Sequence, residues 1–224
     1  MNLNDWINFD KYSVEVVVLA LCGAVFWVSV YLFTIRIIIS KKWVEMPVYV
    51  ACGNIVWEFL WGFVFYEQID MGKLFIYSYR IWFILDVYIF ISIYRYSYKQ
   101  IENAFLRQHA KKLVIGLTAM WFILLYAFIA TGVDAPFGAQ SSYILNLGIS
   151  TLYILMWLRL GNTQSFSRPI AFCKMIGTAF YTVFFAVQFP GNYFVPAIGS
   201  VIFILDLTYT FLLVKGSGLI ARAA

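Results

Sequence analysis

Seven apolar stretches dominate the sequence, and each is close to the roughly 20 residues that a helix needs to cross the hydrocarbon core of a bilayer. They lie at about 15–39, 46–66, 75–97, 112–132, 141–160, 170–189 and 193–214. Only short turns remain between them, which leaves no room for a separate soluble domain in a chain of 224 residues. The sequence therefore predicts an all-α membrane protein, a seven-transmembrane helix bundle that forms a single transmembrane domain over residues 1–224.

The distribution of basic residues predicts the orientation of this bundle. Of the 16 Lys and Arg residues, 13 fall on one side of the predicted spans, and only Lys11, Lys73 and Arg80 fall on the other. Because loops rich in Lys and Arg stay in the cytoplasm, the N-terminus is expected outside and the C-terminus inside. The expected location is the cytoplasmic membrane of a bacterium or the endoplasmic reticulum of a fungus. Orientation also accounts for the net charge of +5, so no nucleic-acid partner is expected.

Composition excludes several kinds of site. Hydrophobic residues make up 63% of the chain and charged residues 12%, against roughly half and a quarter in soluble domains. Any chemistry must therefore take place within the bundle or at its mouths. His109 is the only histidine, and Cys22, Cys52 and Cys173 lie in apolar spans without metal-ligand spacing. We therefore expect no metal centre, no histidine-based triad and no cofactor.

A short internal echo links the third and seventh predicted spans. The sequence Phe-Ile-Leu-Asp at 83–86 recurs at 203–206, which is 120 residues later. Pro47 and Pro169 also open the second and sixth spans, where a proline in the first turn is tolerated. The echo is consistent with a parallel three-plus-one-plus-three repeat, and a chance match between two apolar segments is the alternative.

Three carboxylic acids lie inside predicted spans: Glu58, Asp86 and Asp206. An ionisable group in the middle of a membrane helix costs at least about 2.5–3.5 kcal/mol on insertion scales, so such residues need a reason to be there. At 1.5 Å per residue they lie about 12, 16 and 20 Å from the outer ends of their spans, so all three fit in one layer. Burial beside a second acid favours a protonated carboxyl, which is a proton donor. The alternative is a purely structural hydrogen bond to a neighbouring helix.

Polar and aromatic residues share helix faces with these acids. Asn54 and Trp61 lie about one turn before and after Glu58, Trp82 lies one turn before Asp86, and Tyr209 follows Asp206 by three residues. Asn146 belongs to a polar stripe in the fifth span. These positions predict a polar pocket in the outer half of the membrane. Because aromatic faces attract cations by up to about 2 kcal/mol, Trp57, Trp61 and Trp82 are candidates for stabilising a carbocation.

Several of these residues form a recognisable series of motifs. They are Gly-Asn-Ile-Val-Trp-Glu-Phe at 53–59, Tyr-Arg-Ile-Trp at 79–82 before Asp86, Asn146 with Trp-Leu-Arg at 157–159, and Asp-Leu-Thr-Tyr at 206–209. The series resembles the integral-membrane terpene cyclases of fungal meroterpenoid and indole-diterpene biosynthesis, a family that also has bacterial relatives. The likeness extends over nearly the whole chain, and Gly-Asn-x-x-Trp-Glu is its most specific part.

The resemblance implies a metal-independent cyclisation that begins with protonation of a prenylated or epoxyprenylated lipophilic precursor. It implies that Glu58 and Asp206 are the essential acid pair, and the residues leave open which of them donates the proton. Asn54, Trp57, Trp61, Trp82, Asp86, Asn146 and Tyr209 are the expected supporting residues. The chain agrees on one negative point, because no two acids are adjacent or separated by one residue. It therefore lacks the acidic clusters with which soluble terpene synthases hold Mg²⁺ around a diphosphate.

Other functions are compatible with seven apolar spans. A small transporter could use the buried acids to bind a proton or a cationic solute. A retinal-type photoreceptor would need a lysine in the middle of the membrane, whereas Lys174 and Lys215 are expected near cytoplasmic ends. A structural membrane partner would tolerate Glu58→Gln. The sequence predicts partners of two kinds, a lipophilic prenylated small molecule and membrane lipid, and does not reveal the oligomeric state.

Overall fold

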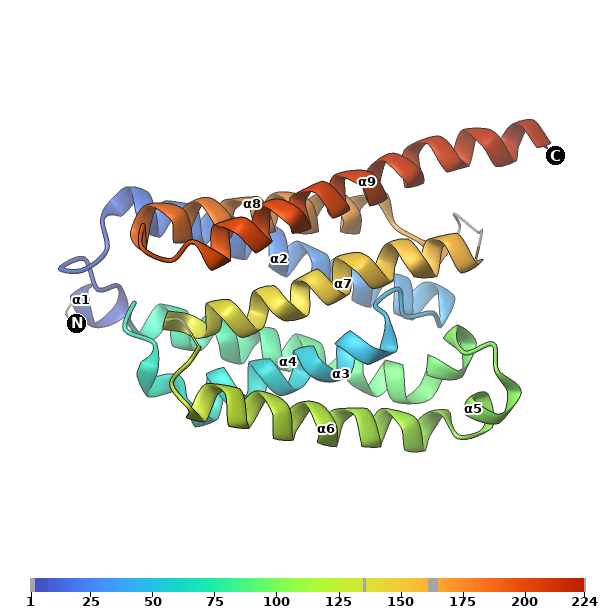
Figure 1. Ribbon diagram of the computed structural model, residues 1–224, viewed down its shortest axis with the longest axis horizontal. Helices are drawn as coiled ribbons and strands as arrows, with labels where there is room; N and C mark the ends of the chain where they lie inside the picture. The colour runs from blue at the N-terminus through green and yellow to red at the C-terminus, as the bar shows by residue number, and fades with distance from the viewer. Residues whose placement is uncertain (1–2, 135, 161–164, 224) are drawn as a thin grey trace.

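The computed structural model of the chain describes residues 3–134, 136–160 and 165–223, and the regular elements in these residues are helices. The long helices run side by side along the longest axis of the molecule (Figure 1). In chain order they are α2 (Val14–Lys41), α3 (Val48–Phe59), α4 (Lys73–Tyr96), α6 (Ala110–Ala130), α7 (Ala139–Leu160), α8 (Arg168–Gln188) and α9 (Phe194–Ala223). Shorter helical segments are α1 (Leu3–Trp6), η1 (Leu60–Val64), η2 (Tyr66–Gln68), η3 (Ser97–Gln100), α5 (Ala104–Gln108) and η4 (Pro136–Gly138). The prediction of an all-α membrane protein is confirmed.

Each of the seven predicted spans forms a helix, but the helices differ in length. Within the described residues, six are long and apolar enough to cross a membrane, and the apolar helix at Val48–Val64 is shorter than these. The seventh span is longer than predicted, because α9 continues to Ala223. The orientation of the bundle and the three-plus-one-plus-three repeat stay predictions.

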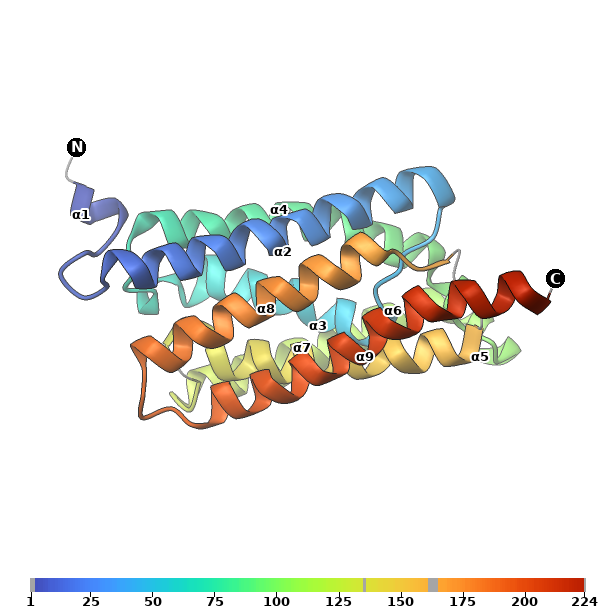
Figure 2. The same ribbon diagram turned by 90° about the horizontal axis from the view of Figure 1, so that it is seen from above.

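The helices pack in two groups that contact each other. In one group α8 lies between α2 and α9, and α9 also packs on α7. In the other group α3 packs against both α4 and α6. Contacts of α2 with α4 and of α3 with α7 join the two groups, and the two ribbon views show the same arrangement (Figures 1 and 2). Segments that are far apart in the sequence therefore enclose the space between the groups.

Small residues let α2 and α8 approach closely. A Cβ atom added to Gly23 would lie 2.8 Å from the Tyr181 ring, and one added to Gly177 would lie 2.9 Å from the Trp27 ring. Neither distance leaves room for a side chain. Because lipid is as apolar as the helix surfaces, close packing of this kind is a main source of association between membrane helices. It also places Trp27 and Tyr181 at the centre of the bundle.

Helix α3 widens into a π-helical turn directly after Glu58. The turn is η1, in which the backbone N–H of Phe65 donates to the carbonyl of Leu60 at 2.7 Å. Arg80 of α4 donates its Nε–H to the carbonyl of Gly62 at 3.0 Å, which satisfies a backbone group within the widened turn. Single π-helical turns inside α-helices are rare and frequently lie at functional sites.

The connection between α2 and α3 is tied to α9 by a buried acid outside the predicted spans. Glu45 is fully buried, and its Oε1 accepts a hydrogen bond from the hydroxyl of Tyr209 at 3.2 Å. Burial raises the pKa of Glu45 to about 8, although the hydrogen bonds from Tyr209 and the Ser167 backbone and the charge of Lys41 act in the opposite direction. Glu45 is therefore held mainly in its neutral form at neutral pH.

Stability should fall as the pH rises through the range set by Glu45. Its carboxyl loses its proton near pH 4.5 in the unfolded chain and near pH 8 in the folded one. Between these values the folded chain binds a proton that the unfolded chain has lost, so the free energy of unfolding decreases by up to about 1.4 kcal/mol per pH unit. In the Glu45→Gln variant, the thermal unfolding midpoint should depend less on pH between pH 5 and 8. The Glu67→Gln variant, changed at an exposed site, should keep the pH dependence of the unchanged protein. An equally steep fall in the Glu45 variant would contradict this assignment.

Candidate active site

A cavity lies between the two helix groups, near the centre of the bundle. Its walls come from α2, α3, α4, α7 and α8, together with Met71 and with Phe137 of the η4 turn. The empty space between these walls measures about 1040 Å³ including its open mouth. The lining is mainly aromatic: Trp27, Tyr31, Trp57, Phe75, Tyr79, Trp82, Phe137, Tyr143, Tyr181, Phe184 and Phe185.

Glu58 is the one carboxylic acid among the described residues that line this cavity. It is 1% exposed, and its Oε1 accepts hydrogen bonds from the Tyr31 hydroxyl and from Asn54 Nδ2, the latter at 3.0 Å. Asn54 Nδ2 also lies 2.9 Å from the Tyr31 hydroxyl oxygen and 3.3 Å from Asp86 Oδ2. A single amide therefore links two buried acids from different helices, and Tyr31 from a third helix completes the group.

The neighbouring acid of Glu58 is thus Asp86, and the structure does not bring the predicted partner Asp206 into this group. Asp206 is not among the residues that line the cavity. Lys174 Nζ lies 2.8 Å from each of its carboxylate oxygens and 2.6 Å from Ser150 Oγ. The Lys174 and Asp206 side chains are each 3% exposed, so this is a buried ion pair. A catalytic role for Asp206 stays a prediction. Such a role would not rest on a cavity that Asp206 shares with Glu58.

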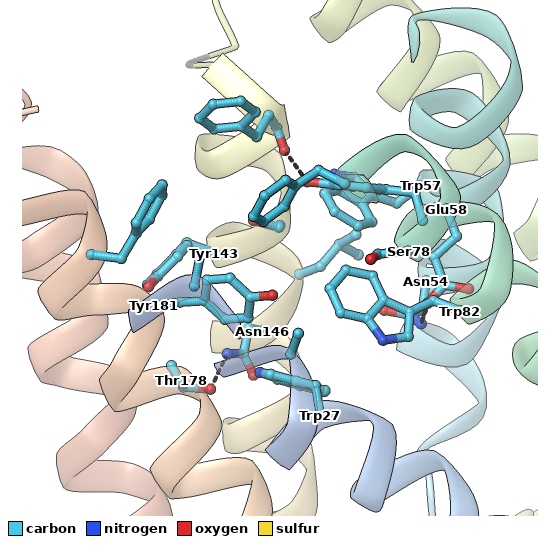
Figure 3. A pocket seen from close by; sticks show the side chains of 18 of the residues that line it. Trp27, Asn54, Trp57, Glu58, Ser78, Trp82, Tyr143, Asn146, Thr178 and Tyr181 are labelled. Atoms are coloured by element: carbon cyan, nitrogen blue, oxygen red, sulfur yellow. Dashed lines mark hydrogen bonds between the residues drawn. The ribbon is translucent and has the colours of Figure 1, made fainter. Parts of the chain in front are cut away.

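Hydrogen bonds fix the aromatic rings near Glu58. The Trp57 indole N–H donates to Ser141 Oγ at 2.8 Å, and the Tyr79 hydroxyl donates to the Phe137 carbonyl at 2.8 Å. The Trp57 and Tyr79 ring centroids are 5.2 Å apart, and the Trp82 ring meets Tyr79 edge-on at 5.5 Å. Trp57 and Trp82 therefore line the cavity as rigid faces beside the acid (Figure 3).

The opposite wall carries a second polar group. Asn146 of α7 donates from Nδ2 to Thr178 Oγ1 of α8 at 2.9 Å, and both residues line the cavity. Figure 3 shows this pair on one side of the cavity and Glu58 with Asn54 on the other. The cavity thus has two polar regions separated by aromatic surface. The sequence predicted Asn146 as part of such a wall, but not its partner.

Besides Asp86, which is linked to the cavity wall through Asn54, two supporting residues predicted from the sequence lie outside the cavity lining. Trp61 is 1% exposed and packs against the η4 turn, where a Cβ on Gly138 would collide with its indole. Tyr209 binds Glu45, and its ring lies 5.2 Å from that of Tyr153. Both positions were inferred from helical spacing alone, which shows what shares a face but not what that face contacts.

Sequence reasoning missed two residues that complete these polar groups. Tyr31 is one of 16 tyrosines, and nothing in its local pattern marks it. Lys174 was assigned to a cytoplasmic end, yet it is 2% exposed and lies six residues into α8. A signal did exist for Lys174, because a lysine inside an apolar helix requires an acid nearby, and Asp206 was the unexplained one.

The titratable side chains do not gather into a metal site in the part of the chain that the structure describes. No group of three or more His, Cys, Asp and Glu residues there could hold a metal ion. The expectation that the reaction uses no metal or cofactor stays a prediction.

Comparison with known proteins identifies relatives over most of the chain. The chain is 27% identical over 205 residues to the Pyr4-family terpene cyclase mfmH of Annulohypoxylon moriforme, covering 86% of this chain and 83% of that protein. It is 28% identical over 165 residues to the terpene cyclase macJ of Penicillium terrestre, covering 70% of this chain and 60% of that protein. No solved structure matches.

The family comparison agrees with these relatives and with the resemblance seen in the sequence motifs. The model of the family described as Pyr4-like transmembrane terpene cyclases matches residues 8–216, which include all the helices that enclose the cavity. This chain therefore belongs to the Pyr4-like transmembrane terpene cyclases.

Proposed function

We propose that this terpene cyclase protonates a prenylated or epoxyprenylated lipophilic precursor from Glu58 and encloses the resulting carbocation while rings form. The observation that carries the proposal is the position of Glu58, the one acid among the described residues that line an otherwise aromatic cavity. Two neighbouring carboxyls in an apolar interior cannot both ionise cheaply. The link through Asn54 to Asp86 therefore favours a Glu58 that holds a proton.

The proposed reaction returns the proton that it consumes. Glu58 gives its proton to an epoxide oxygen, whose C–O bond breaks, or to a terminal alkene carbon. The electron pairs of neighbouring alkenes then form the new C–C bonds, and loss of a proton from the carbon next to the last cation forms an alkene and restores the proton of Glu58. Tyr31 and Asn54 stabilise the Glu58 carboxylate by hydrogen bonds while it lacks its proton. The product is an isomer of the substrate.

The aromatic walls have two roles in this proposal. Each ring face over a desolvated positive charge contributes up to about 2 kcal/mol, and Trp57 and Trp82 lie on the same side of the cavity as Glu58. The rings also keep water away from the cation, which would otherwise be captured as an alcohol. The Trp57 bond to Ser141 and the edge-on contact of Trp82 with Tyr79 hold both rings in place.

Asp206 has a positioning role in this proposal. It holds Lys174 and, through it, Ser150. Lys174 lies one turn before Thr178 on α8, and Ser150 lies one turn after Asn146 on α7. The ion pair therefore supports the polar wall opposite Glu58 without reaching the substrate.

We also propose that seven helices cross the membrane, with the N-terminus outside and the C-terminus in the cytoplasm. The far end of α9 lies at the opposite end of the bundle from α1 (Figure 1), as an odd number of crossings requires. The connections rich in Lys and Arg lie at the end that carries α5, which is the end expected in the cytoplasm.

Glu58→Gln should abolish most turnover and leave the yield of folded protein unchanged. The amide keeps the size of the side chain but cannot deliver a proton, and loss of a positioned general acid costs typically 10²–10⁴-fold in rate. Membranes containing the protein would be incubated with an epoxyfarnesyl phenol, and mass spectrometry would detect an isomer of altered retention. Glu45→Gln changes a buried acid outside the cavity in the same way and should keep activity. Turnover at the wild-type rate in Glu58→Gln would refute the proposal.

Asp206→Asn should lower both activity and folded yield, because breaking one side of a buried ion pair costs about 3–5 kcal/mol. The double variant Asp206→Asn with Lys174→Met removes both charges and should recover folded yield and much of the turnover. Detergent-extracted yield and product formation measure the two effects. If the double variant folds normally but stays as inactive as the single variant, Asp206 takes part in proton transfer and the positioning role is wrong.

Labelling of introduced cysteines tests the orientation. Glu102→Cys lies between α4 and α6, and Glu67→Cys lies between α3 and α4, both at exposed positions. In intact cells a membrane-impermeant maleimide should label the cysteine at position 67, and the cysteine at position 102 should react only after permeabilisation. The reverse pattern would invert the proposed orientation.

A further inference from the structure

The side-chain oxygen of Asn146 is a buried acceptor that has no hydrogen-bond partner in the described part of the chain. Asn146 is 8% exposed and lines the cavity. Its Nδ2 is bonded to Thr178, whereas its Oδ1 has no hydrogen-bond partner among the described residues. Buried polar atoms are nearly always bonded, and one that is not calls for an explanation. Here the adjacent cavity offers one, because a bound ligand can supply the missing donor.

Hydrogen bonds surround the Asn146 and Thr178 pair on both helices. The backbone carbonyl oxygen of Asn146 accepts a hydrogen bond from Ser150 Oγ at 3.0 Å, and Ser150 Oγ in turn accepts one from Lys174 Nζ at 2.6 Å. On the other side, the carbonyl oxygen of Thr178 accepts a hydrogen bond from Thr182 at 2.8 Å. The amide is therefore fixed by Thr178 on one side, and its Oδ1 is left without a partner among the described residues.

The surroundings of Asn146 favour a neutral ligand group. Among the described residues that line the cavity there is no Lys or Arg, and the nearby Lys174 is bonded to both oxygens of Asp206. A carboxylate or diphosphate would therefore meet no compensating charge, and an amide oxygen accepts a hydrogen bond but cannot donate one. A hydroxyl group, whether phenolic or aliphatic, fits this acceptor.

We propose that Asn146 Oδ1 accepts a hydrogen bond from a hydroxyl group on the polar head of the substrate, which fixes the direction in which the prenyl chain reaches across the cavity to Glu58. The inference rests on the proposed function, because it uses Glu58 as the reacting end. Asn146 is then a specificity-determining residue, which selects hydroxylated head groups over their ethers. The aromatic surface between the two polar regions accommodates the chain.

A matched pair of compounds tests the inference by binding alone. The probes are an epoxyfarnesyl phenol and its O-methyl ether, which differ only in the ability to donate a hydrogen bond. Both are titrated into Glu58→Gln protein in lipid nanodiscs, so that no turnover occurs, and quenching of tryptophan fluorescence reports binding beside Trp27, Trp57 and Trp82. The phenol should bind about tenfold more tightly, since the ether leaves a buried acceptor unpaired.

Removal of the acceptor should remove the preference. With Asn146→Leu added, the two probes should bind within about twofold of each other. Asn146→Leu combined with Thr178→Val replaces both partners by apolar groups, keeps the shape of the wall and should give the same result if the single change impairs folding. Ser92→Ala deletes a buried hydroxyl whose bond is to Tyr88 of its own helix, away from the cavity, and should keep the tenfold preference.

The outcomes separate the two proposals. Equal binding of phenol and ether in protein that contains Asn146, or a preference that survives both Asn146 variants, would overturn the head-group assignment and leave the amide with bound water alone. The two failures are distinguishable, because mass spectrometry of the same Glu58→Gln samples shows whether the phenol is converted, independently of the comparison between phenol and ether. Conversely, a Glu58→Gln protein that still cyclises the phenol would refute the donor assignment while the binding preference stands.

Discussion

The structure depends on one constraint, which is that a polar or charged group inside an apolar bundle must find its partner within the protein. Glu58 and Asp86 meet this constraint through Asn54 and Tyr31, and Asp206 meets it through Lys174. Each solution joins side chains from three helices, which are α2, α3 and α4 for the first group and α7, α8 and α9 for the second. The contacts that make the buried groups tolerable therefore also decide which helices are neighbours, and the cavity lies between them.

The polar group around Glu58 and the one around Asp206 have different surroundings, and our proposal gives them different roles. Glu58 lines a cavity walled by aromatic rings and bonds to uncharged groups, which is the basis for proposing it as the proton donor. Asp206 bonds to a cation with both of its oxygens and lies outside the cavity lining. Our proposal therefore assigns Asp206 to support of the adjacent wall and Glu58 to the chemistry, so the two buried acids act for different physical reasons.

On the Glu58 side of the cavity, helical spacing predicted well which residues are neighbours. Those neighbours lie one turn apart on the same helix. Asn54 and Glu58 are bonded across a single turn of α3, as expected for that spacing. The structure does not place Asp206 beside Glu58. Distance along a helix axis gives the depth of a residue in the membrane but not its direction around the axis. The same limit applies to Trp61 and Tyr209, because their side chains contact other parts of the protein and do not line the cavity.

The sequence by itself determined the class of the protein, its seven apolar helices and the identity of the buried acids, because hydrophobic length and the cost of a charge in lipid are properties of local composition. Only the tertiary structure decided that Asp86 rather than Asp206 is the neighbour of Glu58, that Tyr31 and Lys174 complete the two groups, and that Asn146 lines the cavity with an Oδ1 that has no partner among the described residues. These pairings depend on which helices pack together and at what rotation. Such contacts join residues far apart in the sequence, and no local pattern contains them.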